Sequence, residues 1–222
     1  MLTLVLTRHG LTTRSKPEQH LGQTIDVPLS PDGREQADRL RDRLAGIDFD
    51  RILSSPLARA RETAAIVAGD RDVTVDPRLR EMDYGAWEGL TYAQIHERDP
   101  VRRRAWERDP AVLRCPDGES GNDVAARAGA FLVDLLETHV ARHGSSETDE
   151  WPVLAVGHSS LNRILVCLAL GLPIREFRQR FTQDQVNVTV LRFEHGDGPS
   201  DARLLLLNDV EHVCADGAPP WE

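Results

Sequence analysis

Residues 2–10 read Leu-Thr-Leu-Val-Leu-Thr-Arg-His-Gly, a mainly apolar run that ends abruptly in a cation, a histidine and a glycine. A continuous run of this kind is typical of a parallel strand that is buried on both faces. Such strands belong to sheets with helices on both sides, and ligands bind beyond the carboxyl ends of the strands. The stretch therefore predicts an α/β protein and places Arg8 and His9 at the edge of the sheet where a ligand would bind.

The rest of the chain alternates between strand and helix patterns. Short apolar runs predict strands at 51–54, 73–75, 153–156, 187–193 and 202–207, the last two joined by a turn rich in Gly, Pro and Asp. Helices are expected from Ser30-Pro31, from Pro56 to about Ala68, from about Gly121 to His143 and from Ser159 to Leu170. We expect a three-layer α/β/α sandwich around a mostly parallel sheet, in a single domain that spans residues 1–222.

Residues 83–119 form the least regular segment. The segment contains Trp87, Trp106 and several prolines, and it is a candidate insertion or lid over one end of the sheet. Both tryptophans are expected to pack in the core or in the lid. The run Arg102-Arg103-Arg104 is expected to be a solvated face, as charge runs usually are.

Composition and charge narrow the class of protein. The 222 residues carry a net charge of −9 with a globular proportion of hydrophobic residues, which argues against a disordered chain and against a general nucleic-acid binder. Three widely spaced cysteines, Cys115, Cys167 and Cys214, predict neither a disulfide framework nor a zinc site. Because the sequence shows no secretory pattern and no membrane-spanning stretch, we expect a cytoplasmic protein; its oligomeric state is left open.

Polar side chains follow several of the predicted strands directly. Arg8 and His9 follow the first strand, and His158 follows the strand 153–156. Arg59 lies in the helix that opens after the strand 51–54. If these strands are neighbours, two histidines and two arginines converge on one crevice.

This set of side chains suits phosphoryl transfer. Two arginines can hold the non-bridging oxygens of a phosphoryl group, and a neutral histidine can attack phosphorus in line. Glu81, which follows the third strand, could supply the proton that the leaving alcohol needs. Because the arginines offset the charge that a metal would otherwise offset, we expect neither a metal nor another cofactor. The expected partner is a small phosphorylated metabolite.

Four blocks of sequence resemble the histidine phosphatase superfamily, also called phosphoglycerate mutase-like. They occur in the order and spacing of that family and, with weaker matches, extend the resemblance over most of the chain. The blocks are residues 7–10 (Thr-Arg-His-Gly), 54–64 (Ser-Ser-Pro-Leu-Ala-Arg-Ala-Arg-Glu-Thr-Ala), 79–81 (Leu-Arg-Glu) with 85–89 (Gly-Ala-Trp-Glu-Gly), and 156–159 (Val-Gly-His-Ser).

The resemblance implies a phosphoglycerate mutase-like fold and a metal-independent phosphomonoesterase. By position, His9 would be the phosphorylated nucleophile and Glu81 the proton donor. Arg8, Arg59 and His158 would form the phosphate pocket. The block 84–89 looks more like the phosphatase branch than the mutase branch.

Some positions depart from the family pattern. An acidic residue often follows Arg-His-Gly, but Leu11 stands there in this chain, and Thr12 is expected to contact the phosphate. Where an asparagine often helps to bind phosphate, the chain has Arg14-Ser15. Loop 22–29 resembles the substrate loop of the family, which suggests a substrate contact for Gln23. Ser159, at the start of a helix, is expected to bind substrate as well.

Neighbouring residues compete for two of these roles. Arg61 is two residues from Arg59 and faces another side of the same helix, so it is expected to be solvated or paired with a carboxylate. Asp83 and Glu88 could be mistaken for the proton donor. Glu81 itself could instead form a surface salt bridge with Arg78 or Arg80.

Three other functions remain open. Residues 157–161 resemble the nucleophile elbow of a serine hydrolase, with Ser159 as the nucleophile and Asp209 and His212 as its partners. A non-enzymatic module that binds a phosphorylated ligand would be expected to lack the nucleophile or the acid. Within the family, the closest rival is a phosphoglycerate mutase.

Overall fold

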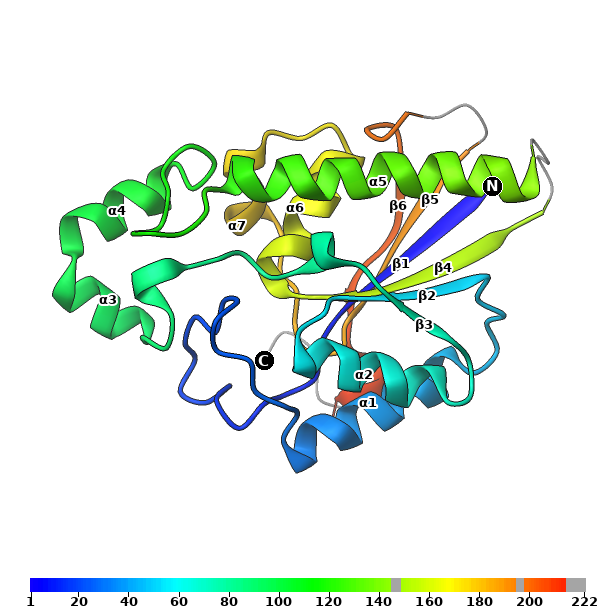
Figure 1. Ribbon diagram of the computed structural model, residues 1–222, viewed down its shortest axis with the longest axis horizontal. Coiled ribbons are helices and arrows are strands. Elements are labelled where there is room, and N and C mark those ends of the chain that lie inside the picture. Colours follow the sequence, from blue (N-terminus) through cyan, green and yellow to red (C-terminus); the bar gives the residue numbers. More distant parts are fainter. Residues whose placement is uncertain (145–148, 195–197, 215–222) are drawn as a thin grey trace.

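A six-stranded sheet forms the centre of the molecule (Figure 1). The structure is a computed structural model that describes residues 1–144, 149–194 and 198–214. In sheet order the strands are β3 (Val73–Val75), β2 (Arg51–Ser54), β4 (Trp151–Gly157), β1 (Leu2–Arg8), β5 (Val188–Phe193) and β6 (Arg203–Asp209). The first four strands run parallel, whereas β5 is antiparallel to both β1 and β6. The prediction of a mostly parallel sheet is confirmed. Part of the predicted turn between the last two strands, residues 195–197, lies outside the described residues.

Helices cover both faces of this sheet. In Figure 1, α1 (Pro31–Leu44) and α2 (Ala58–Ala68) lie on one side, and α5 (Gly121–His143) and α6 (Ser159–Ala169) lie on the other. Strand β1 serves both layers, because its alternate side chains point to opposite faces. Leu4 and Leu6 pack in the cluster with α5 and α6, and Val5 packs in the cluster with α1 and α2. The predicted α/β/α sandwich is therefore confirmed.

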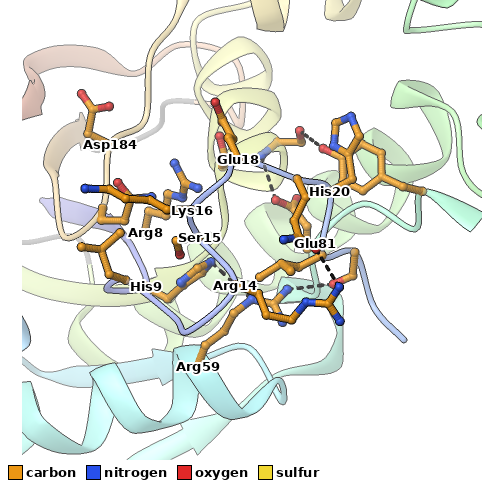
Figure 2. A pocket seen from close by; sticks show the side chains of 18 of the residues that line it. Arg8, His9, Arg14, Ser15, Lys16, Glu18, His20, Arg59, Glu81 and Asp184 are labelled. Atoms are coloured by element: carbon orange, nitrogen blue, oxygen red, sulfur yellow. Dashed lines mark hydrogen bonds between the residues drawn. The ribbon is translucent and has the colours of Figure 1, made fainter. Parts of the chain in front are cut away.

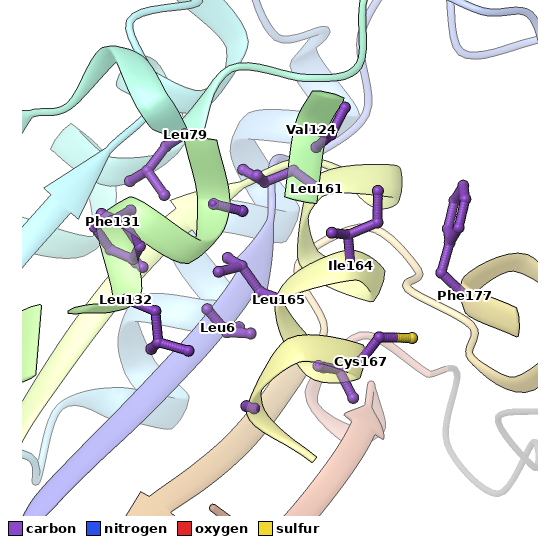
Figure 3. Close-up of a cluster of buried hydrophobic side chains, with 14 of the residues drawn as sticks. Leu6, Leu79, Val124, Phe131, Leu132, Leu161, Ile164, Leu165, Cys167 and Phe177 are labelled. Carbon is purple, nitrogen blue, oxygen red and sulfur yellow. The ribbon is translucent and has the colours of Figure 1, made fainter. Parts of the chain in front are cut away.

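The larger hydrophobic cluster holds β1, α5 and α6 together (Figure 3). Phe131 and Leu132 of α5 face Leu161 and Leu165 of α6 across this cluster, and all four side chains are buried. Burial of such side chains stabilises a fold by about 1.5–3 kcal/mol each, which makes this layer a rigid support for the residues at the start of α6.

Local signals explain where the helices begin. Ser30 caps α1 by accepting the N–H of Gly33, and Pro31 takes the first helical position. Ser120 and Asp123 form a capping box at the start of α5. Helix α2 begins at Ala58 rather than at Pro56, because the Ser55 hydroxyl accepts the N–H of Leu57 and holds the chain in a turn.

Residues 83–119 form short helices that the sequence patterns did not reveal. They are η2 (Gly85–Trp87), α3 (Tyr92–Arg98) and α4 (Pro100–Arg108). Trp87 and Trp106 are buried in the same core as the sheet, as expected. The expectation of a solvated arginine run is wrong for Arg103, which is buried against both tryptophan rings and Tyr92.

Four short helices complete the described fold. They are η1 (Pro77–Leu79), η3 (Ile174–Glu176), α7 (Phe177–Arg180) and η4 (Glu211–Val213). Within the described ranges, no helix is both long enough and apolar enough to span a bilayer.

Candidate active site

The carboxyl ends of three adjacent strands bring the predicted site residues together. Strands β2, β4 and β1 are neighbours, and Arg8 of β1 lies opposite Gly157 of β4. The chain leaves these strands at His9 and at His158, whose ring centroids are 5.2 Å apart. The condition for a shared crevice, that these strands are neighbours, is met.

The strand ends open into a cavity of about 340 Å³. Figure 2 shows Arg8, His9, Arg59 and Glu81 around it, together with the segment that carries Arg14, Ser15 and Lys16. The lining is rich in cations: Arg8, Arg14, Lys16, Arg59, Arg163 and Arg178 all contribute to it, against the acidic Glu18, Glu81 and Asp184.

Hydrogen bonds fix the orientation of the buried His9 ring. Nδ1 lies 2.7 Å from the carbonyl oxygen of Gly10, which can only accept, so Nδ1 carries the proton. Nε2 then holds a lone pair and accepts from Nε of Arg59 at 3.3 Å. Burial, followed by the positive charges of Arg59 and Arg8, holds the pKa of His9 well below its ordinary value of 6.5. The ring is therefore a neutral imidazole whose Nε2 can act as a nucleophile.

Arg59 is fixed as firmly as the ring that it contacts. Its side chain is 1% exposed, and its two terminal nitrogens donate to the carbonyls of Ile25 and Gly22 at 3.2 and 2.7 Å. Arg61, two residues along α2, is exposed and does not line the cavity. The helix thus presents Arg59, and not Arg61, to His9, as the sequence predicted.

Arg8 is held by the segment that precedes strand β5. Its backbone N–H donates to the side-chain oxygen of Asn187, and its Nη1 donates to the carbonyl of Gln183 at 2.9 Å. Nε of Arg8 is buried and bonds no acceptor within the described residues. This N–H is therefore available to an anion in the cavity.

His158 is completely buried, and its Nε2 lies 2.8 Å from the hydroxyl of Ser55. That hydroxyl already accepts the N–H of Leu57, so its own proton can go to Nε2. Nδ1 then carries the ring proton, and it bonds no group within the described ranges. Burial and the neighbouring cations, Arg59 first, hold the pKa of His158 well below its ordinary value. His158 is thus a neutral ring beside His9, and in the tautomer that the Ser55 contact permits, its Nδ1 can donate a hydrogen bond.

Glu81 lies at the amino end of α6, and its side chain is buried. Its carboxylate accepts the N–H groups of Met82 at 2.8 Å, Leu161 at 3.2 Å and Ser160 at 3.3 Å. The alternative of a surface salt bridge is not realised, because Arg78 pairs with Asp76 and Asp134 instead. Glu81 lines the cavity, whereas Asp83 and Glu88 do not.

The three expected substrate contacts lie in different places. Ser159 lines the cavity, as expected for the first residue of α6. Thr12 is buried and does not line the cavity. Its backbone N–H and its hydroxyl are hydrogen-bonded to the hydroxyl of Ser15, and Ser15 does line the cavity. Gln23 is turned away and donates to the carbonyl of Glu81 at 2.8 Å. In this structure Thr12 and Gln23 support the wall of the cavity without lining it.

Sequence reasoning missed part of the cavity wall. Tyr84 and Tyr92 come from the segment 83–119, and Arg163 and Arg178 come from α6 and α7. Arg163 could have been found, since it lies four residues after Ser159 and so on the same face of the helix. No local pattern marks Arg178, because only the packing of α7 against α6 brings it to the site.

Two other chemistries find no support in the geometry. Ser159 lines the cavity, whereas His212 and Asp209 do not, and Asp209 pairs with Arg43, so the serine-hydrolase triad is not assembled. Within the described residues, no group of three or more His, Cys, Asp or Glu side chains is placed to hold a metal ion.

Comparison with known proteins agrees with this geometry. The family model described as the histidine phosphatase superfamily (branch 1) matches residues 4–209. The chain belongs to this superfamily. The resemblance inferred from the four sequence blocks is therefore confirmed, and the histidine phosphatase fold supplies the frame for the site.

Similar proteins include several that are named as phosphatases and one that is named as a probable mutase. The chain is 40% identical over 174 residues to a glucosyl-3-phosphoglycerate phosphatase of Mycolicibacterium vanbaalenii, covering 77% of this chain and 75% of the relative. It is 30% identical to a probable phosphoglycerate mutase of Enterobacter, covering 97% and 96%. Among solved structures, a mycobacterial glucosyl-3-phosphoglycerate phosphatase complexed with VO3 matches with a TM-score of 0.83 and 32% identity, covering 94% and 99%. This histidine phosphatase chain is accordingly a phosphoglycerate mutase-like phosphatase.

Proposed function

We propose that the chain hydrolyses small phosphomonoesters through a phosphohistidine intermediate on His9. The observation that carries this proposal is the state of the His9 ring: it is neutral, protonated on Nδ1, and its Nε2 lone pair accepts from Arg59 at the wall of a cavity lined by cations. A buried nucleophile of this kind, next to guanidinium groups, matches what transfer of a phosphoryl group requires.

In the first step, Nε2 of His9 attacks phosphorus and forms a P–N bond while the ester P–O bond breaks. The leaving oxygen takes a proton from the carboxylic acid of Glu81, and the free alcohol departs. In the second step, a water molecule attacks phosphorus and gives a proton to the Glu81 carboxylate. The P–N bond breaks, inorganic phosphate leaves, and His9 returns to its neutral state.

Arg8, Arg59 and His158 would hold the non-bridging oxygens during both steps. Nε of Arg8 and Nδ1 of His158 are buried donors that bond no acceptor within the described residues. Donors fixed in a buried site stabilise developing charge more strongly than solvated ones, because they do not have to reorient. We propose that these groups, with the guanidinium of Arg59, supply the charge stabilisation without a metal ion.

Ser159 and Ser15 are proposed as further contacts at the edge of the phosphate site, because both line the cavity. Thr12 and Gln23 are proposed to act indirectly, Thr12 through Ser15 and Gln23 through the backbone of Glu81. Segment 83–119 is proposed as a wall of the substrate site, since its Tyr84 and Tyr92 line the cavity. We propose that residues 1–222 form a single domain.

The partner is proposed to be a small phosphorylated metabolite, neither nucleic acid nor membrane. A cytoplasmic location is proposed on the basis of Cys115, Cys167 and Cys214, which are all free thiols.

The decisive experiment compares wild type with His9→Ala on p-nitrophenyl phosphate and a panel of phosphomonoesters in the presence of EDTA. We expect phosphate release that survives EDTA, disappears in the variant, and is accompanied by an acid-labile phosphoenzyme after rapid quenching. Equal activity of wild type and His9→Ala would refute the proposal. Ser159→Ala separates the two chemistries: as a contact at the edge of the phosphate site, Ser159 should cause only a modest loss when removed, whereas a serine hydrolase would lose its activity entirely.

The same panel separates phosphatase from mutase. Isomerisation of 3-phosphoglycerate without net release of phosphate would assign the chain to the mutase alternative.

A further inference from the structure

Two arginines in the cavity have no role in the proposed reaction. Arg163 lies on α6, one turn beyond Ser159, and Arg178 lies on α7. Both line the same cavity as His9. Neither forms an ion pair with a carboxylate within the described residues. Their charge is therefore free to act on a ligand.

Arg163 is held in an unfavourable place for a cation. Its Nε is buried and bonds no acceptor within the described part of the chain. Burial, followed by the positive charges of Arg178 and Arg8, lowers the pKa of its guanidinium from the ordinary value. A half-buried guanidinium whose Nε has no acceptor costs stability, and a bound anion would offset that cost.

The acidic groups near this pair are already engaged. Glu81 accepts three backbone N–H groups, as described above. Glu18 accepts the hydroxyl of Tyr92 at 3.0 Å, and Asp184 accepts the side-chain amide of Asn208 at 2.7 Å. Within the described residues, Arg163 and Arg178 therefore have no carboxylate paired with them, and Glu81 acts on Arg163 only at longer range.

Arg178 is also fixed in position. Its guanidinium carbon lies 4.9 Å from the ring centroid of Trp106, a buried residue of α4. Stacking on an aromatic face restrains the planar guanidinium and leaves its edge free for hydrogen bonds. A planar carboxylate matches such an edge, because it can accept two parallel N–H bonds from one arginine.

We propose, on the basis of the proposed function, that Arg163 and Arg178 form a second anion subsite that binds a carboxylate on the alcohol part of the substrate. The preferred substrates are then phosphorylated hydroxy acids, with the phosphoryl group at His9 and the carboxylate at the two arginines. Phosphomonoesters of neutral alcohols bind without this contact. The cavity of about 340 Å³ has room for both groups of a small molecule.

The test uses pairs of substrates that differ only at the proposed contact. 3-Phosphoglycerate and glycerol 3-phosphate differ by a carboxylate in place of a hydroxymethyl group, and phosphoserine differs from phosphoethanolamine by a carboxylate. We expect kcat/KM in wild type to be about tenfold to a hundredfold higher for the carboxylate member of each pair, as charge-assisted hydrogen bonds of this kind provide. The difference should lie mainly in KM.

Arg163→Met and Arg178→Gln are the diagnostic variants. Each variant should bring the ratio of kcat/KM for 3-phosphoglycerate to kcat/KM for glycerol 3-phosphate towards one, because KM for the carboxylate substrate rises. The Arg163→Met protein should also have a melting temperature no lower than that of wild type, because the change removes a half-buried cation whose Nε has no acceptor among the described residues. Arg175→Gln is the matched control, since Arg175 is exposed, does not line the cavity and lies three residues before Arg178.

Two outcomes would overturn the subsite without touching the phosphatase assignment. The subsite would be refuted if wild type had nearly equal kcat/KM values for 3-phosphoglycerate and glycerol 3-phosphate while its His9-dependent hydrolysis of p-nitrophenyl phosphate was intact. It would also be refuted by a high ratio of these two values that both arginine variants retain.

Thermal shift measurements give a reading that does not depend on turnover. If p-nitrophenyl phosphate were not hydrolysed at all, the proposed function would fail. The subsite would then stand only if 3-phosphoglycerate raised the melting temperature more than glycerol 3-phosphate did, and Arg163→Met abolished the difference. Equal shifts would refute it.

Discussion

The hydroxyl of Thr63 joins the backbone of Gly10 to helix α2: it accepts the Gly10 N–H at 3.1 Å and donates to the carbonyl of Arg59 at 2.8 Å. The carbonyl of that same Gly10 accepts the Nδ1 proton of His9. One buried threonine therefore connects the carbonyl that fixes the tautomer of His9, the proposed nucleophile, with the helix turn that carries Arg59, the arginine proposed to bind phosphate.

Thr63→Val should weaken this connection while it preserves the shape of the side chain. The Gly10 N–H would lose its acceptor in a buried place, which costs about 1–3 kcal/mol of stability. Because Gly10 orients His9, we also expect kcat on p-nitrophenyl phosphate to fall by about tenfold. Thr63→Ser keeps the hydroxyl and should retain most of the stability and most of the kcat of wild type. If Thr63→Ser were as impaired as Thr63→Val, loss of the hydroxyl would not explain the effects of Thr63→Val.

Glu81→Gln should discriminate between leaving groups. p-Nitrophenolate is stable as an anion and needs no proton, whereas the alkoxide of glycerol 3-phosphate does. A general acid contributes about 10²- to 10⁴-fold, so the alkyl phosphate should lose activity on that scale while p-nitrophenyl phosphate loses far less. Glu97→Gln, the same change at an exposed site on α3, should leave both rates unchanged. Equal losses on the two substrates would remove Glu81 from the role of proton donor.

Residues that follow strands were the part of the site most open to prediction. His9 and His158 each leave a buried strand, and the parallel pairing of those strands determines that their side chains meet. Arg59 could be chosen over Arg61 because a helix turns two neighbouring positions to different sides. These inferences succeed because they depend on backbone geometry, which hydrophobic patterns encode locally.

Residues on loops and on irregular segments were harder to place. Thr12 and Ser15 are hydrogen-bonded to each other, and which of them faces the cavity depends on a loop conformation that no pattern of residues reveals. Arg103 is buried because aromatic rings from three parts of one segment surround it, and its charge alone suggested a solvated position. Tertiary packing decides such cases, and local sequence does not report it.

Glu88 should act on the phosphate site through the loop that it holds. Its carboxylate accepts the N–H groups of Gln23 and Thr24, at 2.7 and 2.9 Å, and the hydroxyl of Thr24. The ends of this loop offer the carbonyls of Gly22 and Ile25 to Arg59. In Glu88→Ala the loop loses this anchor, and Arg59 loses its fixed position.

We therefore expect Glu88→Ala to weaken competitive inhibition by inorganic phosphate by about tenfold, because phosphate binding depends on a preorganised Arg59. Glu88→Gln keeps one acceptor oxygen and should lie between the variant and wild type. A loss of stability with an unchanged inhibition constant would mean that Glu88 has only a structural role.

Buried histidines should make the fold sensitive to mild acid. Burial is the largest cause that lowers the pKa of His9, His20, His139 and His158 below 6.5, and for His139 the value is about 4. Below about pH 6.5 the unfolded chain binds protons that the folded chain does not, so the free energy of unfolding decreases as the pH falls. Each histidine contributes a slope of about 1.4 kcal/mol per pH unit within its window.

His139 allows this slope to be tested away from the cavity. It lies on α5, and besides burial its pKa responds to the chain's amino-terminal charge and to His143, which lower it, and to Asp50, which raises it. Carboxylates with lowered pKa values, such as Asp76 and Asp123, lose their contribution to stability only below about pH 4, so they do not mask the effect of the histidines.

Urea denaturation of wild type at pH 7.5, 6.0 and 5.0 should show a steady decrease in the free energy of unfolding. In His139→Gln that loss should be smaller by about 1.4 kcal/mol per pH unit, because one group no longer takes up a proton on unfolding. An identical pH slope in the two proteins would show that His139 is protonated in the folded state as readily as in the unfolded one.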